Sequence, residues 1–336
     1  MTPHEGSGPT LEECPPGPAM PPRDARRPHG GALESAAARR GFLLVLLAGI
    51  TWGTSGFSGS LIASRTDLGP LDIAWYRMTI GAVALFIGYL VSRRRRSAVR
   101  PVLGQGVVVR LVLVSAGLAA YQLAYFAAVA QAGVSISTLV ALGLAPLLVA
   151  VGTSALGHGR PDRSTIAALV AALTGLVLLV GISAGADTGT SVLLGALLAT
   201  GSALGYAGVT LAGAGVPSGV PVTLIGFAGG AALLTPVALV VGLHGTTDLA
   251  ALGLLLYLGL VPSALAYSLF FTGLRSVPGP VVSIVTLMEP LTATALATAF
   301  LGERLSPGAL AGGLLVLAAV AGLYLRRMGD SNSRGC

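Results

Sequence analysis

Long apolar stretches separated by short polar segments run through most of the chain, from Gly41 to Leu325. A helix of about 20 apolar residues is long enough to cross the hydrocarbon core of a bilayer. Backbone groups in lipid must find partners within their own segment, so these stretches are predicted to be helices. The pattern predicts ten of them, over residues 42–63, 70–91, 107–128, 133–155, 164–183, 191–213, 221–243, 249–273, 278–300 and 307–326.

Two boundaries in this pattern carry little polarity. The third and fourth helices meet around Gln131–Gly133, and the sixth and seventh meet around Gly215–Val220. Because both connections are short and uncharged, hydropathy alone can merge the helices that they join.

The two tails differ from the rest of the chain. Residues 1–38 are rich in proline, glycine and charge, which predicts a disordered tail. The first apolar stretch starts too late and runs too long for a signal peptide. Residues 328–336 form a short second tail, and both tails are predicted to be cytoplasmic.

Arginine positions predict this orientation. With the N-terminus inside the cell, only Arg65 and Arg304 fall outside, which agrees with the enrichment of basic residues in cytoplasmic loops. Arg77 and Arg110 fall within or at the edge of helices. The predicted cytoplasmic arginines are Arg23, Arg26, Arg27, Arg39, Arg40, Arg93, Arg94, Arg95, Arg96, Arg100, Arg160, Arg163, Arg275, Arg326, Arg327 and Arg334.

Composition supports the membrane assignment. The 336 residues are 54% hydrophobic and only 10% charged, whereas soluble domains carry about 25% charged residues. Mean hydropathy is +0.83, so lipid is predicted to cover most of the surface. The 20 basic residues lie mostly in the tails and at the ends of apolar stretches, which indicates topology signals rather than a nucleic-acid partner. Cys14 and Cys336 lie far apart in the tails, and no disulfide, metal site or cofactor is predicted.

The two halves of the chain match each other at a shift of about 150 residues. Both halves contain a G-x-x-x-G spacing, at Gly49 and Gly53 in one and at Gly201 and Gly205 in the other; Gly226 and Gly230 add a third. Ala145-Pro146-Leu147 likewise matches Glu289-Pro290-Leu291. Five helices per half is an odd number, so the second half must insert upside down. Inverted repeats are typical of transporters.

At these motifs the chain resembles the EamA repeat of the drug/metabolite transporter superfamily. The resemblance implies two inverted five-helix EamA repeats, at residues 39–184 and 190–327, and transport of a small solute. The first half has Leu156-Gly157-His158-Gly159-Arg160 in place of a Gly-Glu-Arg-Leu motif, so a glutamate in both repeats is not expected. The resemblance is carried by Thr51-Trp52-Gly53, Trp75-Tyr76-Arg77-Met78, Leu287-Met288-Glu289-Pro290-Leu291 and Phe300-Leu301-Gly302-Glu303-Arg304-Leu305.

Glu289 is the first candidate site residue, because it is predicted near the midplane of the ninth helix. A charge at that depth costs about 2.5–3.5 kcal/mol on insertion scales and normally faces a cavity or a partner. Glu289 can couple transport to protons or bind a cationic group of the solute. It can equally have a structural role at the helix break that Pro290 introduces.

Arg77 is the second charge predicted within the membrane. It can bind a carboxylate of the solute or pair with Glu289. It can also extend to the outer interface, where Asp72 is its nearest acidic neighbour in the sequence.

Aromatic residues supply the remaining candidates. Tyr121 and Tyr125 are four residues apart and share a helix face, with Gln122 between them. Such a face can provide polar groups in an apolar cavity wall, although helix packing and interfacial belts use the same residues. The other candidates are Trp52, Tyr206 and Tyr267.

These observations predict a secondary transporter, not an enzyme, in the plasma membrane. It moves a small metabolite or drug between bilayer faces by alternating access, with export and proton coupling as the expected mode. A passive channel remains an alternative, and a homodimer is left open. An intramembrane serine protease is a weaker alternative: Gly53-Thr54-Ser55-Gly56 matches G-x-S-G, but no histidine lies within a predicted helix.

Overall fold

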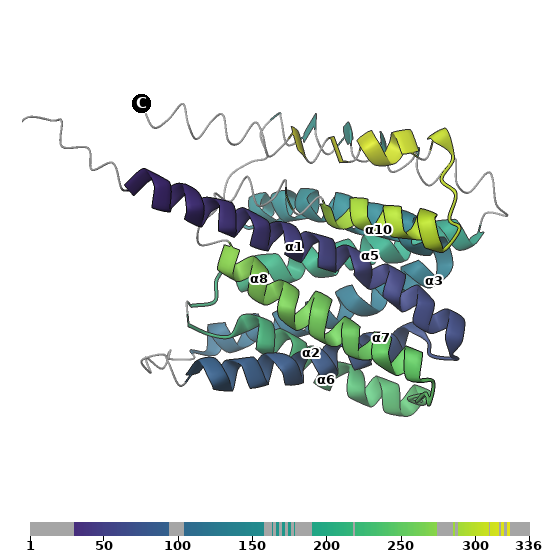
Figure 1. The fold of residues 1–336 in the computed structure, drawn as a ribbon, viewed down its shortest axis with the longest axis horizontal. Coiled ribbons are helices and arrows are strands. Elements are labelled where there is room, and N and C mark those ends of the chain that lie inside the picture. Colours follow the sequence, from purple (N-terminus) through teal and green to yellow (C-terminus); the bar gives the residue numbers. More distant parts are fainter. Residues whose placement is uncertain are drawn as a thin grey trace, which may run out of the picture.

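Every regular element in the described part of the chain is helical (Figure 1). The computed structural model describes residues 30–93, 104–157, 190–217, 219–273, 288–308 and 310–315, and separate positions at 163, 166–167, 170–171, 174–175, 178, 285, 317–318 and 321–322. The elements are α1 (Gly30–Arg65), α2 (Pro70–Arg93), α3 (Gln105–Ala155), α5 (Thr190–Gly213), α6 (Val222–Val241), α7 (Leu249–Gly259), the π-helical η1 (Leu260–Leu265), α8 (Ala266–Gly273) and α10 (Met288–Phe300).

Six segments of the described chain are long and apolar enough to cross a membrane. They are Arg39–Arg65, Pro70–Ser92, Gln105–Ala155, Ser191–Gly213, Val222–Val241 and Leu249–Gly273. The predicted fifth helix (164–183) lies largely outside the described residues, as do the start of the ninth (278–300), residues 1–29 and the C-terminal tail. In the predicted tenth helix (307–326), the described residues 307–308, 310–315, 317–318 and 321–322 are helical.

The longest segment, α3, is two helices rather than one. Gly133 has a non-helical backbone, with φ 77° and ψ 173°. The hydroxyls of Tyr125 and Thr138 lie 2.8 Å apart, although 13 residues of straight helix would separate them by about 20 Å. The chain therefore turns back at Gly133, between a first arm (residues 105–132) and a second arm (residues 134–155). This confirms the predicted boundary between the third and fourth helices.

The boundary between α5 and α6 is also confirmed, because the described residues 214–217 and 219–221 are not helical apart from turns. The predicted 249–273 helix contains a feature that hydropathy did not reveal. Pro262 has no N–H to donate, and around it the helix widens into η1. There the Ser263 hydroxyl donates to the Leu258 carbonyl, five residues earlier, at 2.9 Å.

Helix α1 starts earlier than expected. It begins at Gly30, so residues 30–38 are helical although the sequence predicts disorder there. The segment Ala32–Ala38 is rich in good helix formers, and extending an existing helix costs far less than nucleating a new one.

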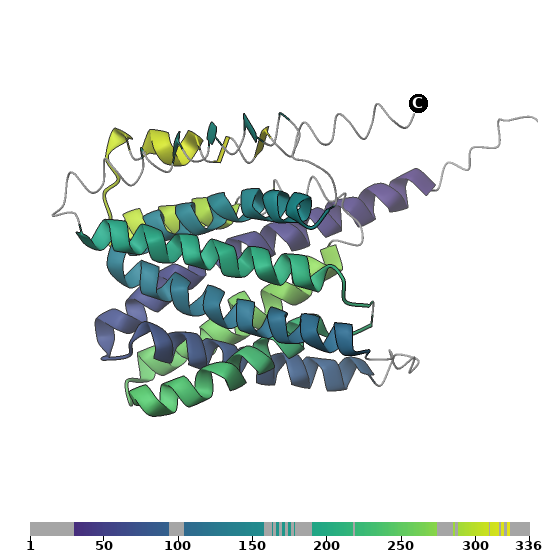
Figure 2. The same ribbon diagram turned by 180° about the vertical axis from the view of Figure 1, so that it is seen from behind.

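Glycines allow helices from different halves to pack closely. A Cβ atom at Gly53 of α1 would lie 2.6 Å from the Glu289 carbonyl oxygen of α10, and one at Gly205 of α5 would lie 2.9 Å from the Gly117 carbonyl oxygen of α3. Gly230 of α6 packs against the Met78 side chain of α2. Small residues let backbones approach where lipid supplies no hydrophobic driving force between helices. Figure 2 shows α5 lying along α3.

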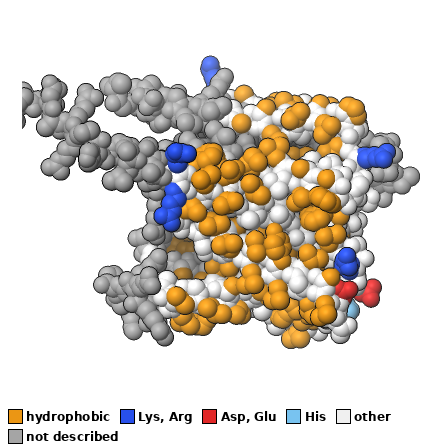
Figure 3. Space-filling view, viewed as in Figure 1, with side chains coloured by type: hydrophobic (Ala, Val, Ile, Leu, Met, Phe, Trp, Pro, Cys, Tyr) orange, Lys and Arg blue, Asp and Glu red, His pale blue; other side chains and the backbone are white. Residues whose placement is uncertain are grey.

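The helices run between two ends of the bundle (Figure 1). The "Asp72 end" holds residues 66–69, the bend at Gly133, residues 242–248 and residues 301–306. At the "Gly213 end", α5 ends, α6 begins, and α3 both begins and ends. On the face shown in Figure 3, hydrophobic side chains cover the area between the ends, and charged side chains gather toward them. This is the surface of a protein whose sides face lipid.

Candidate functional site

A cavity of about 550 Å³ lies between the helices, in the middle of the bundle and toward the Gly213 end. Both arms of α3 and the helices α1, α2, α5, α6, α8 and α10 contribute to its wall, so it is built from both halves of the chain. It is lined by Trp52, Arg77, Val114, Leu118, Tyr121, Leu142, Ala145, Pro146, Val149, Tyr206, Val209, Thr210, Gly213, Val222, Thr223, Gly226, Phe227, Tyr267, Phe270, Phe271, Glu289 and Pro290.

Arg77 lies at the cavity wall rather than at an interface. Its side chain is 4% exposed, and its Nε donates a hydrogen bond to the Ser263 hydroxyl at 3.1 Å. The guanidinium carbon lies 5.7 Å from the centre of the Phe126 ring, which is a cation–π distance. Asp72 is not its partner, because the Asp72 carboxylate contacts His244. The alternative that Arg77 extends to the outer interface beside Asp72 is therefore wrong.

Glu289 lines the cavity at the start of the described part of α10. Of the described lining residues, Arg77 and Glu289 are the charged ones. Within the described chain they form no ion pair with each other. A carboxyl and a guanidinium are therefore both available on the wall of one cavity.

Aromatic rings make up much of the remaining wall. The Trp52 ring centre lies 5.2 Å from that of Tyr267 and 5.1 Å from that of Phe270. Tyr121 and Tyr206 form a second pair, with ring centres 5.7 Å apart. The indole nitrogen of Trp52 is buried and has no hydrogen-bond partner within the described residues. An apolar wall with a few polar groups is typical of small-molecule sites.

Two of the predicted site residues do not line the cavity. Tyr125 stacks beside Tyr121, with ring centres 6.5 Å apart, but its hydroxyl is used by Thr138 at the α3 hairpin. Gln122 is fully buried, and neither its amide oxygen nor its nitrogen has a partner in the described part of the chain. Tyr125 thus joins the two arms of α3, and Gln122 is buried outside the described lining of the cavity.

Several residues at the cavity have little or no signal in the sequence. Ser263 orients Arg77, and the only signal for it was the neighbouring Pro262, which predicts a kink. Phe227, Phe270 and Phe271 line the cavity, but phenylalanine in an apolar helix carries no distinguishing signal. The G-x-S-G match has no support as a catalytic site: Ser55 is 4% exposed, and its hydroxyl is without a partner among the described residues.

Comparison with known proteins places this geometry in a family context. Residues 39–181 and 192–325 each match the EamA-like transporter family. The chain is 32% identical to the uncharacterized transporter YwfM of Bacillus subtilis (strain 168), over 82% of this chain and 93% of that protein. It is 23% identical to the uncharacterized inner membrane transporter YicL of Salmonella typhimurium, over 84% and 95% of the two chains.

One solved crystal structure is similar in fold. The two share a TM-score of 0.58 and 22% sequence identity, over 88% of this chain and 99% of the other. At this identity the similarity shows the fold alone.

Proposed function

Because this chain belongs to the EamA-like transporter family and is a multi-pass membrane transporter, we propose that it exports a small metabolite or drug across the plasma membrane by alternating access. The observation that carries the proposal is a cavity lined by both halves of the chain, whose described lining residues reach the Gly213 end and not the Asp72 end. A passive channel needs a path between both ends, so this geometry favours a carrier over a channel.

The architecture proposed for this function is ten helices in two inverted repeats, with both termini in the cytoplasm. Two observations support it. The loop after the first helix of the first half, residues 66–69, is at the Asp72 end, whereas the corresponding loop of the second half, residues 214–221, is at the Gly213 end. In addition, α1 packs against α10, and α5 packs against the second arm of α3 where Leu211 meets Gly152. The first helix of each half thus contacts the fourth helix of the other half.

The cavity chemistry favours a solute that carries both charges on an apolar body. Glu289 can face an ammonium group, Arg77 can face a carboxylate, and the rings of Trp52 and Tyr267 can pack against the body or the cation. When no solute is bound, the charges of Glu289 and Arg77 would compensate each other. The solute-free carrier could then change conformation without leaving either charge uncompensated.

The test compares metabolites in medium and cytosol of cells that overproduce the wild-type chain, Glu289→Gln or Asp67→Asn. The matched control Asp67→Asn removes an exposed carboxylate outside the cavity. We expect one class of solute to accumulate in the medium with the wild type and the control, and not with Glu289→Gln. Equal profiles in all three strains and in an empty-vector strain, with membrane insertion verified, would contradict export of a cellular metabolite.

A further inference from the structure

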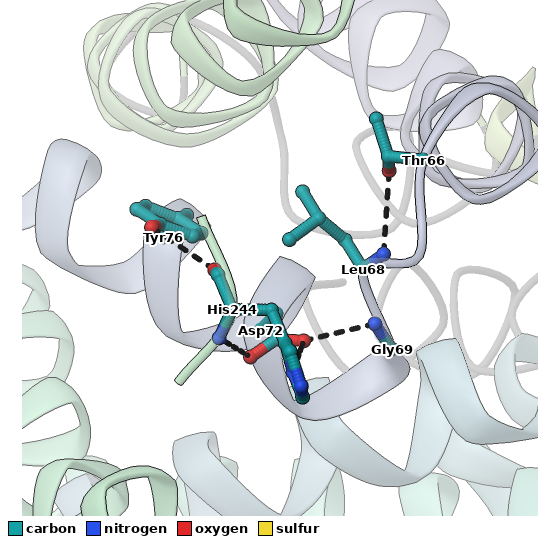
Figure 4. Close-up of polar contacts among 6 residues, drawn as sticks. All are labelled: Thr66, Leu68, Gly69, Asp72, Tyr76 and His244. Atoms are coloured by element: carbon teal, nitrogen blue, oxygen red, sulfur yellow. Dashed lines mark hydrogen bonds and ion pairs between the residues drawn. The ribbon is translucent and has the colours of Figure 1, made fainter. Parts of the chain in front are cut away.

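The end of the bundle opposite the cavity mouth is held together by Asp72 (Figure 4). Its Oδ1 accepts a hydrogen bond from the backbone N–H of His244 at 3.2 Å. Its Oδ2 accepts from the backbone N–H of Gly69 at 3.0 Å and lies 3.3 Å from Nδ1 of His244. The carboxylate is nearly inaccessible, because Asp72 is 3% exposed. A carboxylate of the first half thus binds a loop of the second half.

Tyr76, one turn further along α2, also binds this loop. Its hydroxyl donates to the backbone carbonyl of His244 at 3.2 Å. One turn of α2 therefore binds both the N–H and the C=O of a single residue in the 242–248 loop. This contact fixes the position of the loop through its backbone and does not depend on the His244 ring.

A second carboxylate makes the reciprocal contact. Glu303, in the second half, accepts hydrogen bonds from the backbone N–H groups of Val134 at 2.6 Å and Ser135 at 3.0 Å. These groups start the second arm of α3, where N–H groups have no partner within the helix. A Cβ at Gly133 would lie 2.7 Å from Oε1 of Glu303, so the positive φ and the missing side chain of this glycine make room for the carboxylate.

The two contacts close off the Asp72 end above a layer of tightly packed apolar side chains. Leu68, Ile73, Val134, Ile136 and Leu234 are all buried there, and none of them lines the cavity. At the Gly213 end, no carboxylate within the described residues joins the two halves. The closed and open ends of the cavity therefore differ in the presence of these carboxylate contacts.

We propose that Asp72 and Glu303 form a gate latch that keeps the Asp72 end closed while the cavity faces the Gly213 end. This inference rests on the proposed alternating access. For the Asp72 end to open, the halves must separate there, and both carboxylates must exchange backbone N–H donors for water. Hydrogen bonds to charged groups are the stronger ones, so the latch biases the conformational equilibrium toward the state in which the Asp72 end is closed.

The test measures access to the cavity from each side. Ala145 lines the cavity and is 1% exposed, so Ala145→Cys in a Cys14→Ser, Cys336→Ser background reports on access of a membrane-impermeant maleimide. Both oxygens of each carboxylate accept hydrogen bonds from backbone N–H groups. The amides in Asp72→Asn and Glu303→Gln each have only one side-chain oxygen that can accept. We expect labelling from the Asp72 end to be about tenfold faster in each variant, equivalent to ~1.4 kcal/mol, and slower from the Gly213 end.

Asp67→Asn is the matched control, since it removes the same charge at an exposed position of the same end of the bundle. Its labelling should equal that of the parent. A variant that merely unfolds would label faster from both ends, so opposite changes at the two ends separate gating from loss of structure. Labelling from the Asp72 end that is the same in Asp72→Asn, Glu303→Gln and Asp67→Asn would overturn the latch.

The latch and the proposed function fail in different ways. If wild-type cells export a solute but the latch variants label like the control, the latch is wrong and transport stands. If the latch variants open the Asp72 end as expected while the wild type exports no solute, the latch is supported and the proposed export is wrong.

Discussion

At the scale of single residues, the unusual feature is a guanidinium held away from water by neutral partners. Arg77 has one hydrogen bond to Ser263 and an aromatic face from Phe126. These contacts replace only part of the hydration that a charge loses on burial. In the proposed function, Glu289 across the cavity or a bound solute supplies the rest. Lysine could not replace this arginine, because it lacks the Nε donor and the planar face.

Glu289→Gln tests proton coupling at the same scale. The amide keeps the size of the side chain but cannot bind or release a proton. In proteoliposomes we therefore expect exchange of labelled solute across the membrane to persist, while accumulation driven by a pH gradient is lost. The Asp67→Asn protein should keep both activities. Accumulation by Glu289→Gln that still follows the pH gradient would exclude Glu289 as the proton carrier.

At the scale of elements, glycines determine which helices touch. Gly53 is the second glycine of the G-x-x-x-G spacing in the first half, and Gly201 is the first glycine of the spacing in the second half. In the structure a Cβ at Gly53 would collide with the backbone of α10, whereas one at Gly201 would have no atom within 4 Å. A G-x-x-x-G spacing therefore does not by itself show which of its glycines makes a close contact.

The two glycines predict opposite results on substitution. Gly53→Ala should lower the free energy of unfolding by about 1–3 kcal/mol, the usual cost of overpacking, because the Glu289 carbonyl cannot move aside cheaply. Gly201→Ala should be neutral or slightly stabilising, since alanine favours helix by about 1 kcal/mol over glycine. Thermal unfolding in detergent compares them, and an equal loss of stability in both variants would contradict this difference in packing between Gly53 and Gly201.

At the scale of the whole molecule, each half makes the same kind of helix contact with the other half. Where α2 packs on α7, Gly259 lies against Ile80; where α6 packs on α3, Gly226 lies against Val114. The second helix of each half thus contacts the third helix of the other. Two near-equivalent halves can exchange inward-facing and outward-facing arrangements around a shared cavity, which is how inverted repeats work in transporters.

The orientation in the membrane is testable at this scale. The arginine distribution predicts that the Asp72 end lies outside and the Gly213 end in the cytoplasm. In the background without Cys14 and Cys336, an impermeant maleimide added to intact cells should label Thr247→Cys, at the Asp72 end, and leave Ala214→Cys unlabelled until the cells are opened. Both positions are exposed. The reverse pattern would show that the chain inserts the other way up.

Much of the cavity wall was predictable because charges and large aromatic rings are rare in apolar helices. Arg77 and Glu289 are costly in lipid, so their presence alone indicated a cavity, and both line it with Trp52, Tyr121, Tyr206 and Tyr267. Gln122 was misplaced for a simple reason. Its neighbours Tyr121 and Tyr125 share a helix face, but a residue adjacent to Tyr121 is turned by about 100° around the helix axis.

The class of the molecule follows from the amino-acid sequence without any coordinates: an apolar helical protein, duplicated, with the charges of Arg77 and Glu289 predicted within the membrane. These properties depend on composition and on spacing along one chain, which hydropathy and repeats report directly. Which groups meet across the chain is a property of the folded molecule. The contacts of Asp72 with His244 and of Glu303 with Val134 join residues that are 172 and 169 positions apart, and backbone N–H donors leave no mark in the sequence. For this reason the sequence did not predict that these contacts close the Asp72 end.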